Sequence, residues 1–396
     1  MRNILVPISV WFALALTGCV VAGPRSQPTV PTPEQNPSES IKYTGPLAGI
    51  PAPWAELAGA LVASGLNRAQ VSAFFQSPDL VFSPVPMETK LRELYGIFYR
   101  SDLTKAVQEK LWQIGYDLTI DGRAGSDTQK IIKEFQKDHG LAADGRITDE
   151  LDARLKVVLA TSKVRELSAY KPPPTVKPSR SQTYSQFTNQ TVLRDIKAFY
   201  EADRPLFKQM ENRFKVPGSL VASIMWIETG YGRFFGKRKA AFSLASMAAA
   251  ADIRLVAGRL TDINTNSEAS AFLSDYAAKR GKWAFDELRA LLVYAWDNGL
   301  DPASFLGSVY GAIGYGQFMP SNINKFAADG DGDGRIDLFN KPDAIFSVGK
   351  YLAQSGWRGD MLDEEKRRSV IMLYNRSNVY VNTVLFVADF LAGQTP

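Results

Sequence analysis

One carboxyl group of the sequence, that of Glu228, stands on an apolar helix face. Leu220, Ile224 and Glu228 recur at intervals of four, which places them on the same side of a predicted helix. Gly230 is expected to end this helix just after Glu228. Apolar surroundings and the negative end of a helix both raise a carboxyl pKa, so the group could act as an acid near neutral pH, as in glycosidases. A surface glutamate at a frayed helix end, or one paired with Arg233 or Lys237, is the alternative.

The segment 307–321, GSVYGAIGYGQFMPS, combines glycine with side chains suited to binding a sugar. Tyr315 offers an aromatic face, and Ser308 and Gln317 offer hydrogen-bonding groups. Glycine permits close approach of a ligand to the backbone, and we expect this role for the glycines at 311, 314 and 316. A tightly turned loop with a purely structural role is the alternative.

An acidic loop follows, with the sequence DGDGDGRID at 329–337. Carboxylates at positions one, three and five, glycine at six and a carbonyl at seven are typical of the calcium loop of an EF-hand. The twelfth position holds Asn340 in place of the usual Glu, and Asp343 could replace it. Such close carboxylates repel one another without a cation, which favours Ca²⁺ over a flexible turn. The expected ligands are Asp329, Asp331, Asp333, Asp343 and the carbonyl oxygen of Arg335.

The only cysteine, Cys19, follows a short apolar run, Ile4 to Leu16. A charged start at Arg2 and an apolar run too short to cross a bilayer are typical of a secretory signal peptide. The preceding residues, Leu-Thr-Gly, resemble the lipobox of bacterial lipoproteins, which implies cleavage after residue 18 and lipidation of Cys19. Val20 lacks the acidic character associated with inner-membrane retention, which favours a periplasmic protein anchored in the outer membrane. An ordinary signal peptide that contains a cysteine is the alternative.

Composition and periodicity indicate how the chain is divided. With 396 residues, of which 45% are hydrophobic, it is long enough for two or three globular domains. The net charge of +5 suits an anionic partner, but no dense Lys/Arg block indicates nucleic acid. Proline-rich segments predict a tether at 19–53 and a linker at 161–183. Helical periodicity dominates the remainder, so a mainly α fold is expected.

Residues 101–160 predict a compact three-helix module that contains a short internal sequence repeat. Asp-Gly-Arg occurs at 121–123 and 144–146, each time as a turn before a helix that Ser126 or Thr148 could cap. Both turns, with Phe-Gln-x-x-His-Gly-Leu at 135–141, resemble the peptidoglycan-binding type 1 domain. The resemblance implies binding to peptidoglycan glycan strands. His139, the only histidine, cannot build a zinc site alone and is expected to have a structural role at a helix end.

The remaining motifs resemble the membrane-bound lytic murein transglycosylases of the B type. They are Ile-Glu-Thr-x-Tyr-Gly at 227–232, the segment 307–320, the acidic loop with Asp343, Ser-Gly-Trp at 355–357 and Leu-Tyr-Asn-x-Ser at 373–377. The resemblance implies a lysozyme-like catalytic domain, formed by an N-terminal helical part at 54–100 and by 184–396, with the binding module inserted between them. It assigns Glu228 as the catalytic acid. The substrate-binding residues that follow are Ser308, Tyr315, Gln317, Tyr374 and Asn375.

The activity implied is non-hydrolytic cleavage of the bond between MurNAc and GlcNAc, which leaves a 1,6-anhydro-MurNAc end and needs one carboxyl group. Two alternatives remain open. A hydrolytic muramidase would use a second carboxylate, for which Asp297 and Asp301 are candidates. A non-catalytic lipoprotein could tether membrane to peptidoglycan, although a tether has no reason to keep Glu228 on an apolar face. A calcium sensor is disfavoured, because the chain has a single acidic loop rather than a pair.

Overall fold

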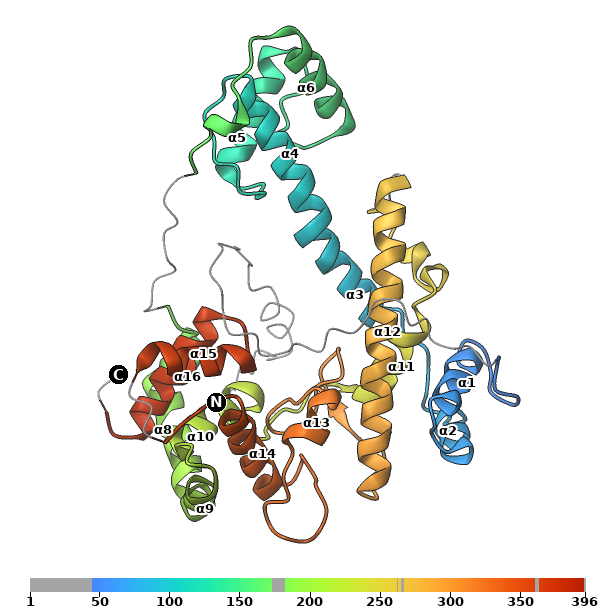
Figure 1. Ribbon diagram of the computed structural model, residues 1–396, viewed down its shortest axis with the longest axis vertical. Coiled ribbons are helices and arrows are strands. Elements are labelled where there is room, and N and C mark those ends of the chain that lie inside the picture. Colours follow the sequence, from blue (N-terminus) through green and yellow to red (C-terminus); the bar gives the residue numbers. More distant parts are fainter. Residues whose placement is uncertain (1–44, 173–181, 262, 265–266, 360–362, 395–396) are drawn as a thin grey trace, which may run out of the picture. The chain divides into compact units, whose positions relative to one another are not determined.

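The computed structural model describes residues 45–172, 182–261, 263–264, 267–359 and 363–394 (Figure 1). The regular secondary structure of the described chain is almost entirely helical, and the chain divides into two compact units. Unit 1 comprises residues up to 87, 178–255 and 278–396. Unit 2 comprises 88–177 together with 256–277. Of the tether expected at 19–53, the part up to residue 44, with Cys19, lies outside the described residues. The remainder is not a tether, because Leu47 and Ile50 are buried and the N–H of Leu47 donates to the carbonyl oxygen of Ala55 at 2.8 Å.

Unit 1 contains most of the helices and the single pair of short strands found in the described chain. In chain order its elements are α1 (Ala55–Ala63), α2 (Arg68–Phe75), α7 (Ser185–Thr188), α8 (Gln190–Ala202), α9 (Arg204–Phe214), α10 (Gly218–Thr229), β1 (Arg238–Lys239), α11 (Ala240–Ala249), β2 (Leu306–Gly307), α13 (Pro320–Phe326), α14 (Lys341–Gln354), α15 (Glu364–Tyr374) and α16 (Asn378–Leu391). Helices α3 (Val85–Leu94) and α12 (Ser267–Asp297) each contribute residues to both units.

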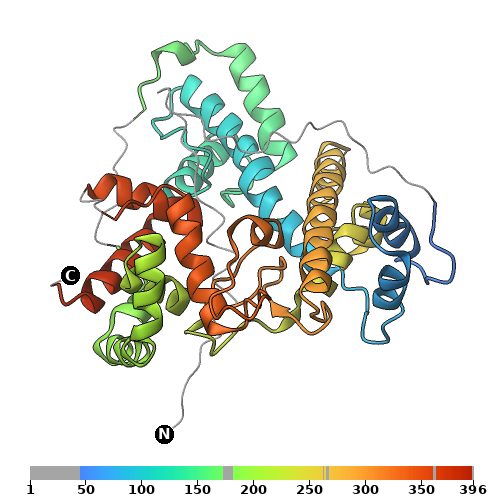
Figure 2. The ribbon, with the colours of Figure 1, turned by 60° about the horizontal axis from the view of Figure 1, so that its bottom comes forward.

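Helix α10 is the centre of unit 1. It packs against α16, α9, α14 and α8, and both views show the green α8–α10 group beside the red α15 and α16 (Figures 1 and 2). Every residue of α10 is buried. A helix that is covered on all sides has no polar face, so any ionisable group on it is removed from water.

The two strands form a minimal antiparallel pair, in which Arg238 lies opposite Gly307 and Lys239 opposite Leu306. Gly236 permits the close approach of the two chains: its φ is 119°, and a Cβ at this position would lie 1.9 Å from the carbonyl oxygen of Gly307. The pair therefore fixes the segment after α10 against the start of the loop 307–321.

Unit 2 contains a π-helical turn (η2, Tyr95–Tyr99) followed by α4 (Arg100–Gln113), α5 (Ser126–Asp138) and α6 (Asp149–Thr161), which Figure 1 shows grouped together. Its core consists of Val107, Leu111, Ile132, Phe135, Leu151 and Leu155. The three-helix unit predicted at 101–160 thus corresponds to α4–α6, whereas its binding function stays a prediction.

The internal repeat of unit 2 is explained by two buried glutamines. The Gln108 side chain accepts from the N–H of Gly122 (2.8 Å) and donates to Asp121 (2.9 Å). Gln136 repeats the arrangement with Gly145 (2.8 Å) and Asp144 (2.8 Å). Each Asp-Gly-Arg turn therefore satisfies a polar side chain that would be costly to bury alone.

Some local predictions for unit 2 hold and others are wrong. Thr148 caps α6 by accepting from the N–H of Leu151 at 3.2 Å, as expected. Ser126 is the first residue of α5 rather than its cap, because Gly125 occupies the cap position. His139 is the residue at which α5 ends, and its ring lies 4.3 Å from that of Phe135, in agreement with a structural role.

The linker expected at 161–183 begins later than predicted. Arg165 pairs with Asp117 at 2.8 Å, and the hydroxyl of Tyr170 accepts from the N–H of Ile120 at 2.8 Å. This stretch therefore packs on unit 2, because its charged and aromatic side chains find partners there. Residues 173–181 lie outside the described chain. Unit 2 also includes residues 88–100 and 256–277, which the predicted boundaries assigned to the catalytic domain.

Candidate active site

Glu228 is the penultimate residue of α10 and is only 6% exposed. The helix ends where expected: Gly230 adopts a left-handed conformation (φ 59°), and its N–H donates to the carbonyl oxygen of Trp226 at 2.8 Å. The next residue, Tyr231, also has a positive φ of 61°, which is unusual for a residue with a bulky side chain. Its hydroxyl donates to Asp203 at 3.0 Å, and this bond holds the turn after Glu228 in place.

The Glu228 carboxyl group has one hydrogen-bond partner among the described side chains. The hydroxyl of Tyr380, on α16, donates to its Oε1 at 2.7 Å. Burial raises the pKa of Glu228 to about 8, although the Tyr380 hydrogen bond acts in the opposite direction. At neutral pH the group is therefore mostly protonated and can donate a proton. The alternative of a surface glutamate paired with Arg233 or Lys237 does not apply, because Glu228 is buried. Arg233 pairs with Asp195 at 3.8 Å, and among the described residues Lys237 forms no ion pair with Glu228.

A pocket of about 450 Å³ opens at this carboxyl group. It is formed by the end of α10, the segment that leads into β1, and the loop after β2. The lining residues are Glu228, Phe234, Phe235, Gly236, Lys237, Arg238, Gly307, Ser308, Val309 and Gln317. Two aromatic rings, two cations, a hydroxyl and an amide thus surround one protonated acid. This mixture of apolar faces and hydrogen-bonding groups is suited to a sugar.

Ser308 lies in the pocket at the end of β2, as the sequence led us to expect. Its Oγ accepts from the N–H groups of Tyr310 (3.2 Å) and Ala312 (3.0 Å), which fixes the side chain. The hydroxyl proton is not used in these contacts and can be donated to a ligand.

Gln317 also lines the pocket, with its backbone in the left-handed region (φ 49°). Its Nε2 donates to the carbonyl oxygen of Gly314 at 3.0 Å and more weakly to that of Phe235 at 3.4 Å. These bonds leave the amide oxygen as the acceptor that the side chain offers to a ligand.

The glycines of the loop 307–321 have a different role from the expected one. A Cβ at Gly311 would lie 2.5 Å from Leu244, one at Gly314 would lie 2.6 Å from Leu338, and one at Gly316 would lie 2.8 Å from Val348. All three therefore allow close packing within the protein rather than close approach of a ligand. The expectation that they open the backbone to a ligand is wrong.

Three of the expected substrate-binding residues are not among those that line the pocket. Tyr315 packs its ring against Phe235 (centroids 5.0 Å apart) and its carbonyl oxygen accepts from the Thr229 hydroxyl at 3.0 Å. Tyr374 donates to the carbonyl oxygen of Gly316. Oδ1 of Asn375 is buried and has no hydrogen-bond partner within the described chain. Tyr315 and Tyr374 thus help to hold the loop that carries Gln317, and binding to substrate by all three residues stays a prediction.

Tyr380 and Arg238 were missed by the sequence reasoning, and Lys237 was named only as a possible ion-pair partner of Glu228. Tyr380 lies three residues after Ser377, whose side chain caps α16, but nothing in that spacing indicates a contact with a helix 152 residues earlier. The two cations follow Gly236 in the run GKRK, and an unbroken basic run beside a candidate site was the available signal.

A second carboxylate is not found in the pocket among the described residues. The two candidates, Asp297 and Asp301, are both exposed and lie outside the lining. Another buried glutamate, Glu287, also has a pKa raised by burial, but it accepts from the N–H and the hydroxyl of Ser321 (both 2.8 Å) at the start of α13. Glu228 is thus the single acid that faces the pocket in the described chain.

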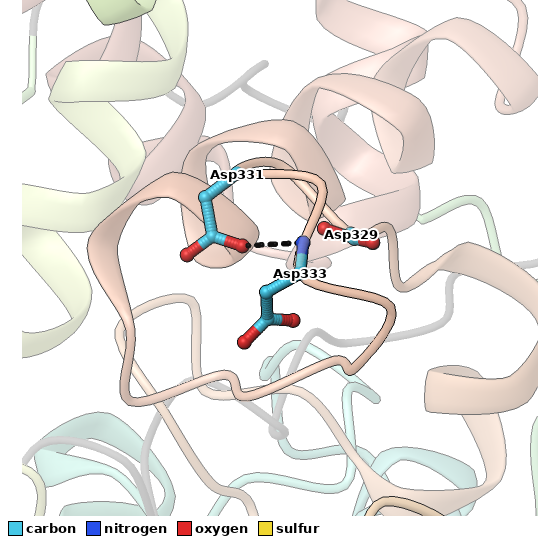
Figure 3. Close-up of side chains that lie close together, drawn as sticks. All are labelled: Asp329, Asp331 and Asp333. Atoms are coloured by element: carbon cyan, nitrogen blue, oxygen red, sulfur yellow. Dashed lines mark hydrogen bonds between the residues drawn. The ribbon is translucent and has the colours of Figure 1, made fainter.

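The acidic loop brings three of its carboxylates together (Figure 3). Oxygen atoms of Asp329, Asp331 and Asp333 lie within 4.8 Å of one another, a spacing that ligands of one Ca²⁺ ion at 2.3–2.6 Å can adopt. The N–H groups of Gly334 and Gly332 hold the pKa of Asp329 below its usual value, so it is a ready anionic ligand. The residues therefore fit the ion.

The other two expected ligands have contacts of their own. Asp343 is buried, and its two oxygens accept from the N–H groups of Gly330 and Asp337, both at 2.7 Å. Asn340, at the twelfth position, donates to Asp331 at 2.8 Å. The N–H of Arg335 donates to Asp333 at 2.8 Å, and the role of its carbonyl oxygen stays a prediction.

The fold and this site define a family. A model of the transglycosylase SLT domain matches residues 127–365, more than half of the chain, and the chain belongs to that family. The mainly helical class expected from the sequence is confirmed, and the lysozyme-like form of the catalytic domain stays a prediction.

Particular relatives can be named. The chain is 33% identical over 150 residues to membrane-bound lytic murein transglycosylase B of Escherichia coli, a match that covers 38% of this chain and 34% of that protein. The chain thus spans about a third of the length of this curated relative. It is also similar to the crystal structure of soluble lytic transglycosylase SltB1 from Pseudomonas aeruginosa (22% identity, TM-score 0.43, 67% of this chain and 98% of that one). A further similar structure is that of Escherichia coli lytic transglycosylase Slt35 in complex with calcium (20% identity, TM-score 0.43, 72% and 97%).

Proposed function

We propose that this protein is a lytic transglycosylase of peptidoglycan, which cleaves the MurNAc-β-1,4-GlcNAc bond without water. Family membership and similarity to a murein transglycosylase support this activity. The observation that carries it is the Glu228 carboxyl group: buried, with a pKa near 8, and alone among the described acids in facing a sugar-sized pocket.

The reaction needs the same group twice. Glu228 donates its proton to the glycosidic oxygen, and the bond from that oxygen to C1 of MurNAc breaks as an oxocarbenium-like centre develops. Glu228, now a carboxylate, takes the proton of the 6-hydroxyl of the same MurNAc, and O6 bonds to C1. The 1,6-anhydro ring closes and Glu228 is protonated again. The Tyr380 hydroxyl stabilises the carboxylate between the two transfers, because it already donates to Oε1.

A hydrolytic muramidase would need a second carboxylate, either about 5–5.5 Å or about 6.5–9.5 Å from the first. The exposed positions of Asp297 and Asp301, outside the pocket lining, argue against both candidates. A non-catalytic tether would gain nothing from burying an unpaired carboxyl group, which opposes folding at neutral pH.

The activity can be tested by release of soluble muropeptides from purified sacculi. Glu228→Gln should lose nearly all release, because Gln keeps the shape but cannot donate the proton, and positioned acid–base catalysis supplies about 10²–10⁴-fold or more. Asp297→Asn and Asp301→Asn are matched controls that change an acid outside the pocket, and both should retain wild-type release. Full activity of the Gln variant would contradict the proposal, and loss in either Asn variant would favour a hydrolase.

Calcium is proposed as a structural ligand of the acidic loop. Asp329, Asp331 and Asp333 would hold it, with Asp343 and the carbonyl oxygen of Arg335 as further candidates. The ion would neutralise three neighbouring carboxylates and so stabilise the loop that leads into α14.

Attachment to the wall and to a membrane are also proposed. The α4–α6 module with its two Asp-Gly-Arg turns would bind glycan strands and hold the enzyme on its polymeric substrate. Lipidation of Cys19 would anchor the chain in a membrane on the periplasmic side, and the curated relative is itself named as membrane-bound. Within the described residues no helix is both long and apolar enough to cross a bilayer. Outer-membrane location follows from Val20 and is part of the same proposal.

A further inference from the structure

Four cations follow the catalytic helix, and the two that reach the pocket are the two without an acidic partner. Arg233 pairs with Asp195 at 3.8 Å and lies over the ring of Trp226 at 4.9 Å. Lys239 pairs with Asp79 at 2.9 Å. Lys237 and Arg238 line the pocket, and neither forms an ion pair or a side-chain hydrogen bond within the described chain.

The strand pair explains this division. Successive side chains of a strand point to opposite faces, so Arg238 and Lys239 of β1 diverge. Arg238 lies opposite Gly307, and both residues line the pocket. The tight approach of Gly236 to the Gly307 carbonyl holds the backbone before both cations. The two charges are thus placed by fixed backbone rather than by a free loop.

These cations do not serve to ionise Glu228. The pKa of its carboxyl group is set by burial and by the Tyr380 hydroxyl, and it stays near 8. With Glu228 protonated, the pocket has two positive charges from Lys237 and Arg238 and no negative one among its lining residues. Phe234 and Phe235 beside them reduce the local polarity, which strengthens attraction of an anion.

We propose that Lys237 and Arg238 form an anion subsite that binds a carboxylate of the glycan substrate beside the cleavage point. This rests on the proposed function and adds a substrate preference to it. GlcNAc is neutral, whereas MurNAc has a lactyl ether that ends in a carboxyl group. That group is a free carboxylate where the stem peptide has been removed. Where a stem is attached it forms an amide, and carboxylates of the stem take its place. Either source presents the same chemistry to a guanidinium and an ammonium group.

The test measures binding to full-length protein in the Glu228→Gln background, which prevents turnover. Calorimetry would compare three ligands: the neutral GlcNAc disaccharide, stem-free GlcNAc-MurNAc, and GlcNAc-MurNAc with a stem peptide. At least one carboxylate-bearing ligand should bind roughly tenfold more tightly than the neutral disaccharide. This is the gain in affinity expected from one charge-assisted hydrogen bond that is partly exposed to solvent. The ligand that shows the gain identifies the lactyl or the stem carboxylate as the group bound.

Adding Lys237→Met with Arg238→Gln should abolish that gain, whereas Lys239→Met, the matched neighbour whose charge lies outside the pocket, should keep it. A melting temperature for each variant verifies folding. The subsite would be overturned if no carboxylate-bearing ligand is preferred, or if the preference survives in the double variant. Its failure is separate from that of the proposed function, because cleavage of sacculi by the wild type is scored independently of these affinities.

Discussion

The hydroxyl of Tyr380 donates a 2.7 Å hydrogen bond to Oε1 of Glu228 and joins α16 to the end of α10. Tyr380 is itself buried, at 2% exposure, and the nearby Glu228 contributes to raising its pKa, after the larger effect of burial. Tyr380 therefore stays protonated and remains a donor whatever the charge of Glu228. A permanent donor stabilises the carboxylate form of the acid, which is the form that exists between the two proton transfers.

Tyr380→Phe should slow cleavage about 10- to 100-fold, the effect of losing one hydrogen bond to a charged group. In the wild type the Tyr380 hydrogen bond lowers the pKa of Glu228, so removing it should raise that pKa. The acid of the variant should then stay protonated to higher pH, and the alkaline limb of the pH–rate profile should shift to higher pH. Tyr351→Phe is the matched control, since its hydroxyl donates only to the Leu373 carbonyl. An unchanged limb with a slower rate would show that Tyr380 does not act on the acid.

The pKa of Glu228 also predicts a pH dependence of stability. The carboxyl group has a pKa of about 8 when folded and an ordinary value of 4.5, so folding takes up a proton between these values. Its contribution to stability is full below pH 4.5 and is lost as the pH rises to about 8. At pH 7 the loss is roughly 3 kcal/mol. Glu228→Gln has no titratable group at this position and so lacks this loss of stability. The melting temperature of the variant should therefore be above that of the wild type at pH 7–8 and close to it near pH 4. A constant difference across this range would contradict a buried neutral acid.

Calcium should stabilise the wild-type chain, by about 2.7 kcal/mol at a hundredfold excess over Kd. Asp331→Asn with Asp333→Asn should remove this effect without lowering the stability of the metal-free protein, because the change relieves repulsion between neighbouring carboxylates. Asp301→Asn, which changes an exposed acid outside the loop, should keep the response. The measurement is the melting temperature with Ca²⁺ and with chelator, and a wild type indifferent to both would exclude a bound ion.

Cys19→Ala should release the full-length protein from the membrane fraction, since no lipid could then be attached. Cleavage of sacculi by the released protein should be unchanged. The fractions are compared by sedimentation after cell disruption. A variant that still sediments with membranes would rule out Cys19 as the anchor.

The sequence predicted those features that depend on neighbours along the chain. Periodicity placed Glu228 on a buried helix face, Gly230 ended that helix, and Thr148 capped α6. Local pattern could not predict contacts made by folding. Tyr380 reaches Glu228 across 152 residues, and the loop glycines meet α11 and α14 rather than a ligand. Arg165 and Tyr170 were assigned to a linker because the prolines that follow dominate the composition, whereas their partners lie about 50 residues earlier.

The most direct test of the single-carboxyl mechanism is the chemical form of the products from purified sacculi. Digests would be reduced with borohydride and measured by mass spectrometry, which separates anhydro ends, unaffected by reduction, from reducing MurNAc ends, which become alditols. If Glu228 alone closes the ring, the wild type should give muropeptides that end almost entirely in 1,6-anhydro-MurNAc, and Glu228→Gln should give no such products. Reduced MurNAc ends as the dominant product would show that water attacks the sugar, and would contradict intramolecular ring closure by Glu228 alone.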